Sequence, residues 1–491
     1  MELIVLTFEA SYTRLPEMLW STCQPTPVKT PKLIAFNTEL AVRLGGDEPP
    51  DEATLAGWFS GNQPPPGAEP VALAYAGHQF GNFVPQLGDG RAVLLGEVVD
   101  PQGQRVDVQL KGSGRTPYSR GGDGRAPLGP VLREYLVSEA MAAMGVPTTR
   151  AMAAVTTGER VVRQLAEPGA VLTRVAASHI RVGTFQFAAL HQDHAALKAL
   201  ADHVIERHYP EVAGAKSPYL ALFEAVLKRQ ARLVAKWMGV GFIHGVMNTD
   251  NMSIAGETLD YGPCAFMEQF DSQKAYSSVD TGKRYAFSNQ PVIAQWNLAR
   301  FAECLLPLLD GDQETRVEQA TASLRRFNDT FDLAWARISA DKLGLAEESE
   351  QAAQMMAALE AQMQQGRMDM TATFDALTQL ARQPDDERRQ ALLVLTTTPE
   401  ALAPWIDEWQ HQQQASQSEE RWQAMRHANP VIIPRNHRVQ EVIDAAYDGD
   451  FAPFHKLLGA VVQPFEASTE ARRLAAPASD SEQVLRTFCG T

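Results

Sequence analysis

The sequence has few cysteines, no long apolar segment and a shortage of positive charge. Only four of its 491 residues are cysteines, at spacings that match neither a zinc motif nor a disulfide framework. No apolar run is long enough to cross a bilayer, and residues 1–6 lack the basic and apolar regions of a signal peptide. Lys and Arg total 44 against 59 Asp and Glu, and the net charge of −15 argues against general affinity for nucleic acids or anionic membranes. We therefore expect a cytoplasmic protein with no nucleic-acid or membrane partner, in which any nucleotide site is locally basic.

The length and the hydrophobic pattern predict an α+β fold with at least two lobes. Residues 92–99 and 105–111 alternate as strands do, and residues 313–414 have a helical period. One helical stripe that ends near Gly239 and Gly241 consists of Phe223, Val226, Leu227, Val234 and Trp237. The expected regions are an N-terminal extension over 1–65, a strand-rich lobe over 66–165, a mostly helical lobe over 166–430 and a C-terminal extension over 431–491.

A lysine at the end of a predicted strand has a candidate partner on the helix that follows it. Period two places Lys111 on the polar face of the strand 105–111, and Glu134 lies near the start of a helix with an apolar stripe. Taken alone, Lys111 is typical of a solvated edge charge. Together, Lys111 and Glu134 reproduce the pair with which protein kinases grip ATP phosphates.

The segment His244–Asn251 has the separation of the kinase catalytic loop, in which the final Asn binds metal. A tight turn at 255–257 then leads to Asp260, at the position of the Asp in the kinase Asp-Phe-Gly motif. Asn251 and Asp260 are therefore candidate ligands of a magnesium ion that bridges ATP phosphates.

The position of the kinase catalytic Asp holds Val246, which cannot accept a proton. A carboxylate appears instead at Asp250, beside Asn251. Either the site is inactive or the base has moved to Asp250. A turn or capping role for Asp250 is plausible on its own, but three polar residues so close together favour a cation site.

The segment Gln86–Arg91 contains two glycines beside an arginine. Gly88 and Gly90 permit backbone N–H groups to approach a phosphate, and Arg91 supplies positive charge. Gly-Asp-Gly is also an ordinary hairpin turn, and in isolation the turn is the better interpretation.

The chain resembles the selenoprotein O family, pseudokinase-fold proteins that transfer AMP to other proteins. The resemblance runs from Tyr75–Gly81 to a cysteine near the C-terminus. Its more specific segments are Gln109–Gly114, Asp123–Ala126, His244–Asn251, Asn289–Pro291 and Pro434–His437. It implies a bilobal, protein-kinase-like fold in which ATP lies flipped relative to kinases, with its α-phosphate toward the target hydroxyl. AMP would then pass to Ser, Thr or Tyr of protein substrates, with Mg²⁺ or Mn²⁺ as the metal.

The resemblance also implies a role for each matching residue. The nucleotide contacts that it implies are Gly88, Gly90, Arg91, Lys111, Asp123, Gly124, Arg174, Arg181 and Asp260. Among these, Arg174 and Arg181 would clamp a buried γ-phosphate, although either arginine alone is typical of a surface salt bridge. Glu134 would pair with Lys111, Asp250 would be the general base, and Asn251 and Asp260 would hold the metal.

Some relatives in this family carry selenocysteine near the C-terminus, where this chain has Cys489. By the family pattern its partner is Cys264. A disulfide between them would tie the tail to the segment that runs from His244 to Asp260, which we call the catalytic segment. The sequence alone favours two reduced thiols in the cytosol. Cys23 and Cys304 are expected to be small apolar fillers.

Three functions remain open at this point: adenylyl transfer, phosphoryl transfer by a kinase, and a catalytically silent ATP-binding scaffold. Val246 counts against the kinase, and the retained Lys111, Glu134, Asn251 and Asp260 count against the scaffold. UMP transfer from UTP is a variant of the first function.

Overall fold

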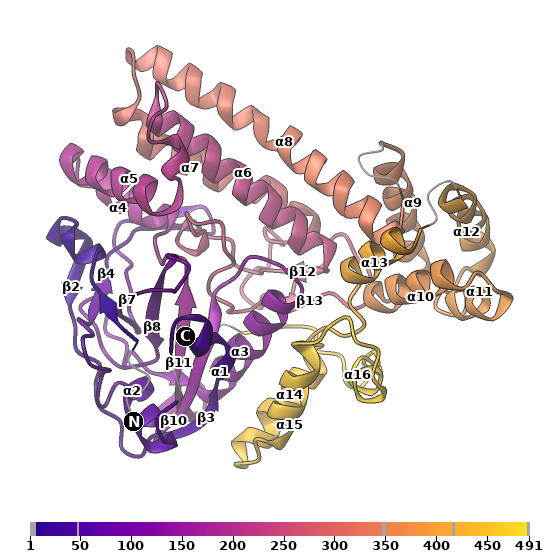
Figure 1. The fold of residues 1–491 in the computed structure, drawn as a ribbon, viewed down its shortest axis with the longest axis horizontal. Coiled ribbons are helices and arrows are strands. Elements are labelled where there is room, and N and C mark those ends of the chain that lie inside the picture. Colours follow the sequence, from indigo (N-terminus) through magenta and orange to yellow (C-terminus); the bar gives the residue numbers. More distant parts are fainter. Residues whose placement is uncertain (1–5, 47–48, 346–349, 415–417, 489–491) are drawn as a thin grey trace.

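The computed structural model describes residues 6–46, 49–345, 350–414 and 418–488, and its N-terminal part is built on one antiparallel sheet of nine strands (Figure 1). In pairing order, the sheet runs β2 (Trp20–Thr22), β4 (Val71–Leu73), β7 (Ala92–Val99), β8 (Arg105–Lys111), β11 (Ala166–Ala176), β10 (Arg150–Val162) and β3 (Lys32–Phe36). Two short strands lie off this path, β1 (Phe8–Glu9) beside β7 and β9 (Ala126–Pro127) beside β11. The strands predicted at 92–99 and 105–111 are confirmed as β7 and β8.

Helices cover both faces of this sheet. They are α1 (Thr38–Arg43), α2 (Glu52–Ser60), α3 (Leu128–Ala143), α14 (Asn436–Tyr447) and α15 (Ala452–Val461). Because side chains alternate along a strand, Val171 of β11 packs with α1 and α2, whereas its neighbour Leu172 packs with α3. On its other side α3 is covered by α14 and α15 (Figure 1). Residues from the two ends of the chain therefore fix the helix that carries Glu134.

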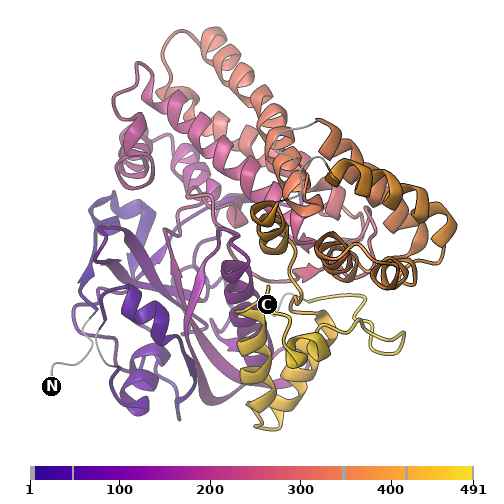
Figure 2. The same cartoon turned by 45° about the vertical axis from the view of Figure 1, so that its right-hand side comes forward.

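The helical part follows the sheet in the chain and gives the molecule its α+β class. Its helices are α4 (Val182–Leu190), α5 (His194–His208), α6 (Pro218–Gly239), α7 (Gln290–Leu305), α8 (Gln313–Leu343), α9 (Glu350–Gly366), α10 (Met370–Arg382), α11 (Asp386–Leu393), α12 (Pro399–Gln414) and α13 (Glu419–Ala428), with α16 (Thr469–Leu474) near the C-terminus. The stripe predicted for α6 is buried, and α7 and α8 pack against this helix (Figure 2). Throughout the described ranges, no helix combines the length and apolar character of a membrane span.

Two short antiparallel ladders flank the segment that contains the expected catalytic residues. β5 (Gly77–Gln79) pairs with β6 (Asn82–Val84) in a hairpin, and β12 (Phe242–Ile243) pairs with β13 (Ala265–Phe266). Both ladders are separate from the nine-stranded sheet.

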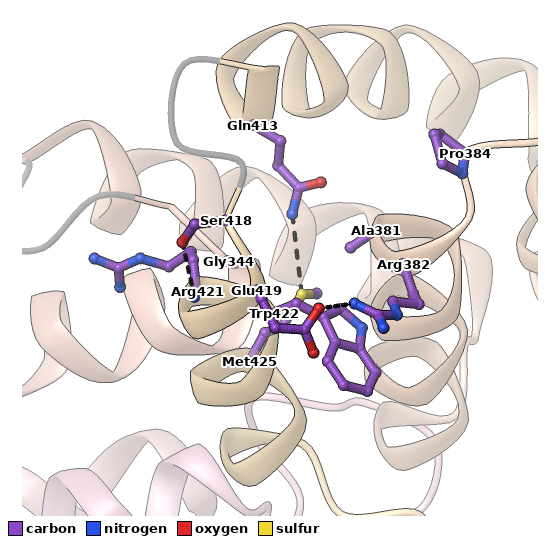
Figure 3. A pocket seen from close by; sticks show the side chains of 10 residues that line it. All are labelled: Gly344, Ala381, Arg382, Pro384, Gln413, Ser418, Glu419, Arg421, Trp422 and Met425. Atoms are coloured by element: carbon purple, nitrogen blue, oxygen red, sulfur yellow. Dashed lines mark hydrogen bonds and ion pairs between the residues drawn. The ribbon is translucent and has the colours of Figure 1, made fainter.

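A pocket of about 290 Å³ opens among α8, α10, α12 and α13 (Figure 3). Its arginines have carboxylate partners, since Arg382 pairs with Glu419, and Arg421 lies 3.5 Å from Asp341. The guanidinium of Arg382 also covers the ring of Trp422 at 4.4 Å. The charges of these arginines are therefore balanced within the protein.

Arg435 ties the C-terminal segment to the helical part. Its buried guanidinium donates to both oxygens of Asp369, at 2.8 and 3.0 Å, and its Nε donates to the carbonyl of Ala475 at 2.7 Å. Asp369 also caps α10 by accepting from the N–H of Ala372. This gives a structural role to part of the Pro434–His437 segment.

Arg435→Met is expected to lower the free energy of unfolding by about 3–5 kcal/mol, because it leaves the carboxylate of Asp369 buried without its main charge partner. Arg438→Met is the matched control, since Arg438 pairs with Glu441 at the surface of the same helix and its loss is expected to cost less than about 1 kcal/mol. Denaturant unfolding followed by tryptophan fluorescence measures both. Equal losses in the two variants would contradict the role given to Arg435.

Candidate active site

Asp260 lies at the centre of a cluster of buried charges. Its Oδ1 accepts hydrogen bonds from Lys111 Nζ at 2.9 Å and Arg174 Nη1 at 2.5 Å. Its Oδ2 accepts one from Arg181 Nη1 at 2.6 Å. Burial alone would raise the pKa of Asp260, but the three positive charges outweigh burial and hold this pKa well below its ordinary value. Asp260 is therefore an ionised carboxylate held by cations from three segments.

The register of the sheet supplies two of these cations. Lys111 ends β8 and donates to Glu134 Oε2 of α3 at 2.6 Å. Gln109, on the same face of β8, lies opposite Arg174 of β11 and hydrogen-bonds to its guanidinium. Arg174 also contacts Glu134, at 3.2 Å. The polar face of β8 thus faces the cluster, and Glu134 is shared by two cations.

The backbone around Asp260 is unusual. Asp260 has φ of +63°, a left-handed conformation that is uncommon for residues other than glycine. His244 Nε2 donates to the carbonyl of Leu259 at 3.0 Å, and the hydroxyl of Tyr261 hydrogen-bonds to that of Thr148. These contacts on both sides fix the carboxylate in the cluster.

Asp250 lies beneath the β5–β6 hairpin. Its Oδ1 is buried and has no hydrogen-bond partner among the described residues, and its Oδ2 accepts only a long bond of 3.4 Å from Gln79 Nε2. Burial raises the pKa of Asp250 to about 6. A Cβ on Gly77 would lie 2.5 Å from Oδ1, so a side chain at position 77 would collide with the carboxylate. This carboxyl group can therefore exchange a proton near neutral pH, and the hairpin covers it closely.

Two alternate residues of the hairpin hold two adjacent residues of the catalytic segment. The N–H of His78 donates to Thr249 Oγ1 at 2.7 Å, and the N–H of Phe80 donates to Asn248 Oδ1 at 3.0 Å. The hydroxyl of Thr249 in turn donates to Gln186 of α4 at 2.6 Å. The two residues immediately before Asp250 are thereby held by the hairpin and by α4.

Arg181 connects Asp250 to the cluster around Asp260. Its Nη1 donates to the backbone carbonyl of Asp250 at 2.6 Å as well as to Asp260 Oδ2. Its guanidinium lies 4.6 Å from the centre of the Tyr75 ring and 4.0 Å from Asp89 Oδ1. Burial raises the pKa of Asp89 to about 6. One arginine therefore sets the spacing between the two carboxylates that the sequence singles out.

The two expected metal ligands offer a limited donor set. Asn251 donates from Nδ2 to the carbonyl of Val246 at 2.8 Å, and Asp260 is occupied by its three cations. Within the part of the chain that the structure describes, no three His, Cys, Asp or Glu side chains form a possible metal site. An amide and a carboxylate oxygen suit a hard cation such as Mg²⁺, with phosphate and water oxygens completing its shell.

The glycine-rich segment joins β6 to β7, and these strands pair with different partners, so it is not the turn of a hairpin. Asp89, between the glycines, accepts hydrogen bonds from the N–H of Leu73 and from Gln109. Gly88 has φ of +91°, and a Cβ there would lie 2.5 Å from the side chain of Tyr118. Gly90 packs on the same segment, and Arg91 leads into β7. Here the glycines allow close packing around a buried carboxylate.

Asp123 and Gly124 lie in the loop between β8 and α3. Asp123 accepts hydrogen bonds from both terminal nitrogens of Arg163, at 2.9 and 3.0 Å. The carbonyl of Gly124 accepts from the N–H of Gly114 at 3.0 Å. In the described structure these contacts join the loop to its own neighbours, and the cluster around Asp260 is formed without it.

The C-terminal tail runs beside the catalytic segment. The hydroxyl of Thr487 donates to the carbonyl of Pro263 at 2.6 Å, and its N–H donates to the carbonyl of Tyr276 at 2.8 Å. Cys264 is buried next to Pro263, whereas Cys489 lies outside the described residues. Cys23 and Cys304 are buried, in keeping with a role as small fillers.

The sequence alone predicts no role for Gln79, Asp89 or Thr249. Gln79 and Asp250 form a hydrogen bond although they are 171 residues apart in the chain, and Asp89 and Leu73 are 16 residues apart. Such contacts cannot be predicted from the local periodicity of the sequence. The only signal for the hairpin is that the family resemblance begins at Tyr75–Gly81.

Comparison with known proteins identifies the family of this chain. The chain matches the family described as Protein adenylyltransferase SelO over residues 2–462. The Protein nucleotidyltransferase YdiU of Rhodopseudomonas palustris strain HaA2 is 55% identical over 491 residues, which cover 99% of both chains. Proteins of the same name from Agrobacterium fabrum and Rhizobium meliloti are each 52% identical; the alignments cover 99% of this chain and, respectively, 100% and 99% of theirs. The chain therefore belongs to the SelO family of protein adenylyltransferases.

Proposed function

We propose that this protein transfers AMP from ATP to the hydroxyl groups of Ser, Thr or Tyr side chains in other proteins. The observation that carries the proposal is the buried, unpartnered Oδ1 of Asp250, in a residue whose backbone carbonyl accepts from the same guanidinium that holds Asp260. Membership of the SelO family and the name nucleotidyltransferase on its relatives support the same reaction.

The proposed nucleotide pose uses the cations that now surround Asp260. Phosphate oxygens would replace this carboxylate as partners of Arg174 and Arg181, which then clamp the γ-phosphate, while Lys111 holds the inner phosphates. Gly88, Gly90 and Arg91 would border the phosphates, and the loop with Asp123 and Gly124 would close over the adenosine. This exchange would also leave Asp260 available to a metal.

Asn251 and Asp260 would hold Mg²⁺ or Mn²⁺, which neutralises phosphate charge when bound. In the chemical step, the target hydroxyl oxygen attacks the α-phosphorus and Asp250 takes up the hydroxyl proton. A new P–O bond forms to the side chain, the bond to the bridging oxygen breaks, and pyrophosphate leaves.

A kinase-like, bilobal fold is part of the proposal. A strand-borne Lys111 paired with Glu134 on α3, before a helical part that holds Asn251 and Asp260, is the order of functional parts in a kinase. The proposed division keeps the regions 1–65, 66–165, 166–430 and 431–491.

A redox role for the tail is also proposed. Thr487 is anchored at Pro263, the residue before Cys264, and two further residues reach about 7 Å along an extended chain. That reach is compatible with the Cα separation of a disulfide between Cys264 and Cys489.

Intact-mass spectrometry of candidate protein substrates, after incubation with ATP or UTP and with Mg²⁺ or Mn²⁺, tests the reaction directly. An adenylyl adduct that depends on ATP and is lost with a chelator is the expected result. A uridylyl adduct would establish UMP transfer, and a phosphoryl adduct would establish a kinase. Binding of ATP with no adduct on any substrate would indicate a catalytically silent scaffold.

Asp250→Asn is expected to lower the rate of transfer by about 10²–10⁴, the usual effect of losing a general base, while the affinity for ATP stays close to that of the wild type. The amide keeps the shape of the side chain but cannot take up the proton. Asp202→Asn, at an exposed carboxylate on α5, is the control and is expected to leave both quantities unchanged. Single-turnover rates and calorimetric affinities separate the two effects. A parallel fall in rate and affinity would mean that Asp250 serves the fold or the metal.

Arg174→Gln and Arg181→Gln are expected to weaken the binding of ATP far more than that of AMP. Each substitution removes charge-assisted hydrogen bonds of roughly 1.5–3 kcal/mol to the γ-phosphate. Lys111→Met is expected to weaken the binding of ATP and of ADP to the same extent. Calorimetry with ATP, ADP and AMP measures these affinities, and thermal unfolding of each variant checks that the protein remains folded. Equal losses for ATP and AMP in the Arg variants would refute the flipped pose.

A further inference from the structure

The outer side of the β5–β6 hairpin forms one continuous surface with a loop and a helix that follow the catalytic segment. We call this surface the docking face, and it consists of residues 77–84, Lys283, Arg284, Val292, Trp296 and Arg300. The inner side of the same hairpin contacts Asn248, Thr249 and Asp250. The docking face and Asp250 therefore lie on opposite sides of one thin hairpin.

The hairpin gives the docking face a fixed shape. Its two-residue turn has positive φ at both positions, +51° at Phe80 and +85° at Gly81, which is the geometry of a type I′ turn. Phe80 adopts this conformation although it is not glycine, and its ring packs against Tyr285 with centres 5.2 Å apart. That packing offsets the backbone strain and holds the turn against the loop that contains Arg284.

Apolar side chains are exposed on the docking face. The ring of His78 contacts those of Phe83 and Trp296, with centres 4.9 and 5.3 Å apart. Phe83 is 41% exposed and Val292 is 65% exposed. Val292, Trp296 and Arg300 are spaced by four residues on α7 and so lie on one face of that helix. Aromatic and aliphatic groups of this kind are typical of the centre of a protein interface.

The charge of the docking face is opposite to that of the molecule. The guanidiniums of Arg284 and Arg300 lie 5.0 and 5.1 Å from the centre of the Trp296 ring, and Lys283 beside them is exposed. Arg300 pairs with Glu303, but among the described residues no carboxylate pairs with Arg284 and its Nε has no hydrogen-bond partner. A half-buried arginine that lacks an anion, in a chain with a net charge of −15, points to an anion supplied by a partner.

The docking face also lies close to the base. A Cβ on Gly81 would lie 3.8 Å from the guanidinium carbon of Arg284, and Gln79, two residues earlier, donates to Asp250. Arg284 and Asp250 therefore contact the same short hairpin at positions two residues apart.

From these observations we propose that the docking face binds the protein substrate, and that a carboxylate a few residues from the target hydroxyl pairs with Arg284. An apolar side chain of the substrate packs on Phe83 and Val292 at the same time. The inference rests on the proposed transfer to protein hydroxyls and adds the class of segment that is selected, an extended acidic one. It also explains why an acidic protein leaves a positively charged, aromatic surface exposed beside its base.

The test uses two fluorescein-labelled peptides, centred on Tyr, that carry either Glu or Lys three residues from it on each side. Fluorescence anisotropy measures their binding to the full chain in the presence of a non-hydrolysable ATP analogue. Wild-type protein is expected to bind the Glu peptide at least about tenfold more tightly, the usual effect of one charge-assisted hydrogen bond. Arg284→Glu is expected to reverse the preference, Arg284→Gln to abolish it, and Phe83→Ala to weaken both peptides.

Arg325→Glu, at an exposed position of α8, is the matched control and is expected to keep the preference. An unchanged affinity for ATP shows that each variant remains folded. Equal binding of the two peptides to the wild type, no binding of either, or a preference that survives Arg284→Glu would overturn the proposal. Mass spectrometry of the same peptides with ATP reports on the reaction separately: a binding preference without adenylyl transfer would count against the proposed function, and transfer without a preference would count against the docking face.

Discussion

The ionised carboxylate of Asp260 is the interaction on which the architecture of the site depends. It holds Lys111 at the end of β8, Arg174 near the end of β11 and Arg181 before α4. Arg174 and Arg181 are buried and Lys111 is partly buried, so their mutual repulsion in a medium of low dielectric constant would be strong if only Glu134 opposed it. The left-handed backbone at Asp260 is thus stabilised by the charges that it brings together. This carboxylate therefore joins the sheet to the segment that contains Asp260.

The second carboxylate depends on the same arrangement. Arg181 bonds to the carbonyl of Asp250 with the nitrogen that also holds Asp260, so a change in one interaction is felt by the other. The two groups nevertheless differ in acidity, because Asp260 has three cations in contact and Asp250 has none on its side-chain oxygens. Their environments move the two pKa values in opposite directions. Such a separation gives two similar side chains different chemical roles.

Much of the fold follows from local pattern, and much of the site does not. Period two and period 3.6 are sufficient to predict β7, β8 and α6, because burial on one face dictates those periods. The pair of Lys111 and Glu134 follows from strand polarity and helix position. Arg174 differs, since its place opposite Gln109 requires the register of β11 against β8, which only the folded sheet defines. The nucleotide-binding role of Arg174 is predicted only by the resemblance to a known family. Residue spacing alone predicts a surface salt bridge at this position.

The β5–β6 hairpin shows why an extended catalytic motif is not a complete description of this site. The base is buried because Gly77 lacks a side chain, and it is positioned because His78 and Phe80 hold the residues that precede it. The same burial raises the pKa of Asp250 and restricts access to it. The hairpin therefore closes one side of this carboxyl group. In the proposed mechanism, the basicity of Asp250 and the selection of its substrate both depend on one two-stranded element that contains no Asp, Glu, Lys or Arg.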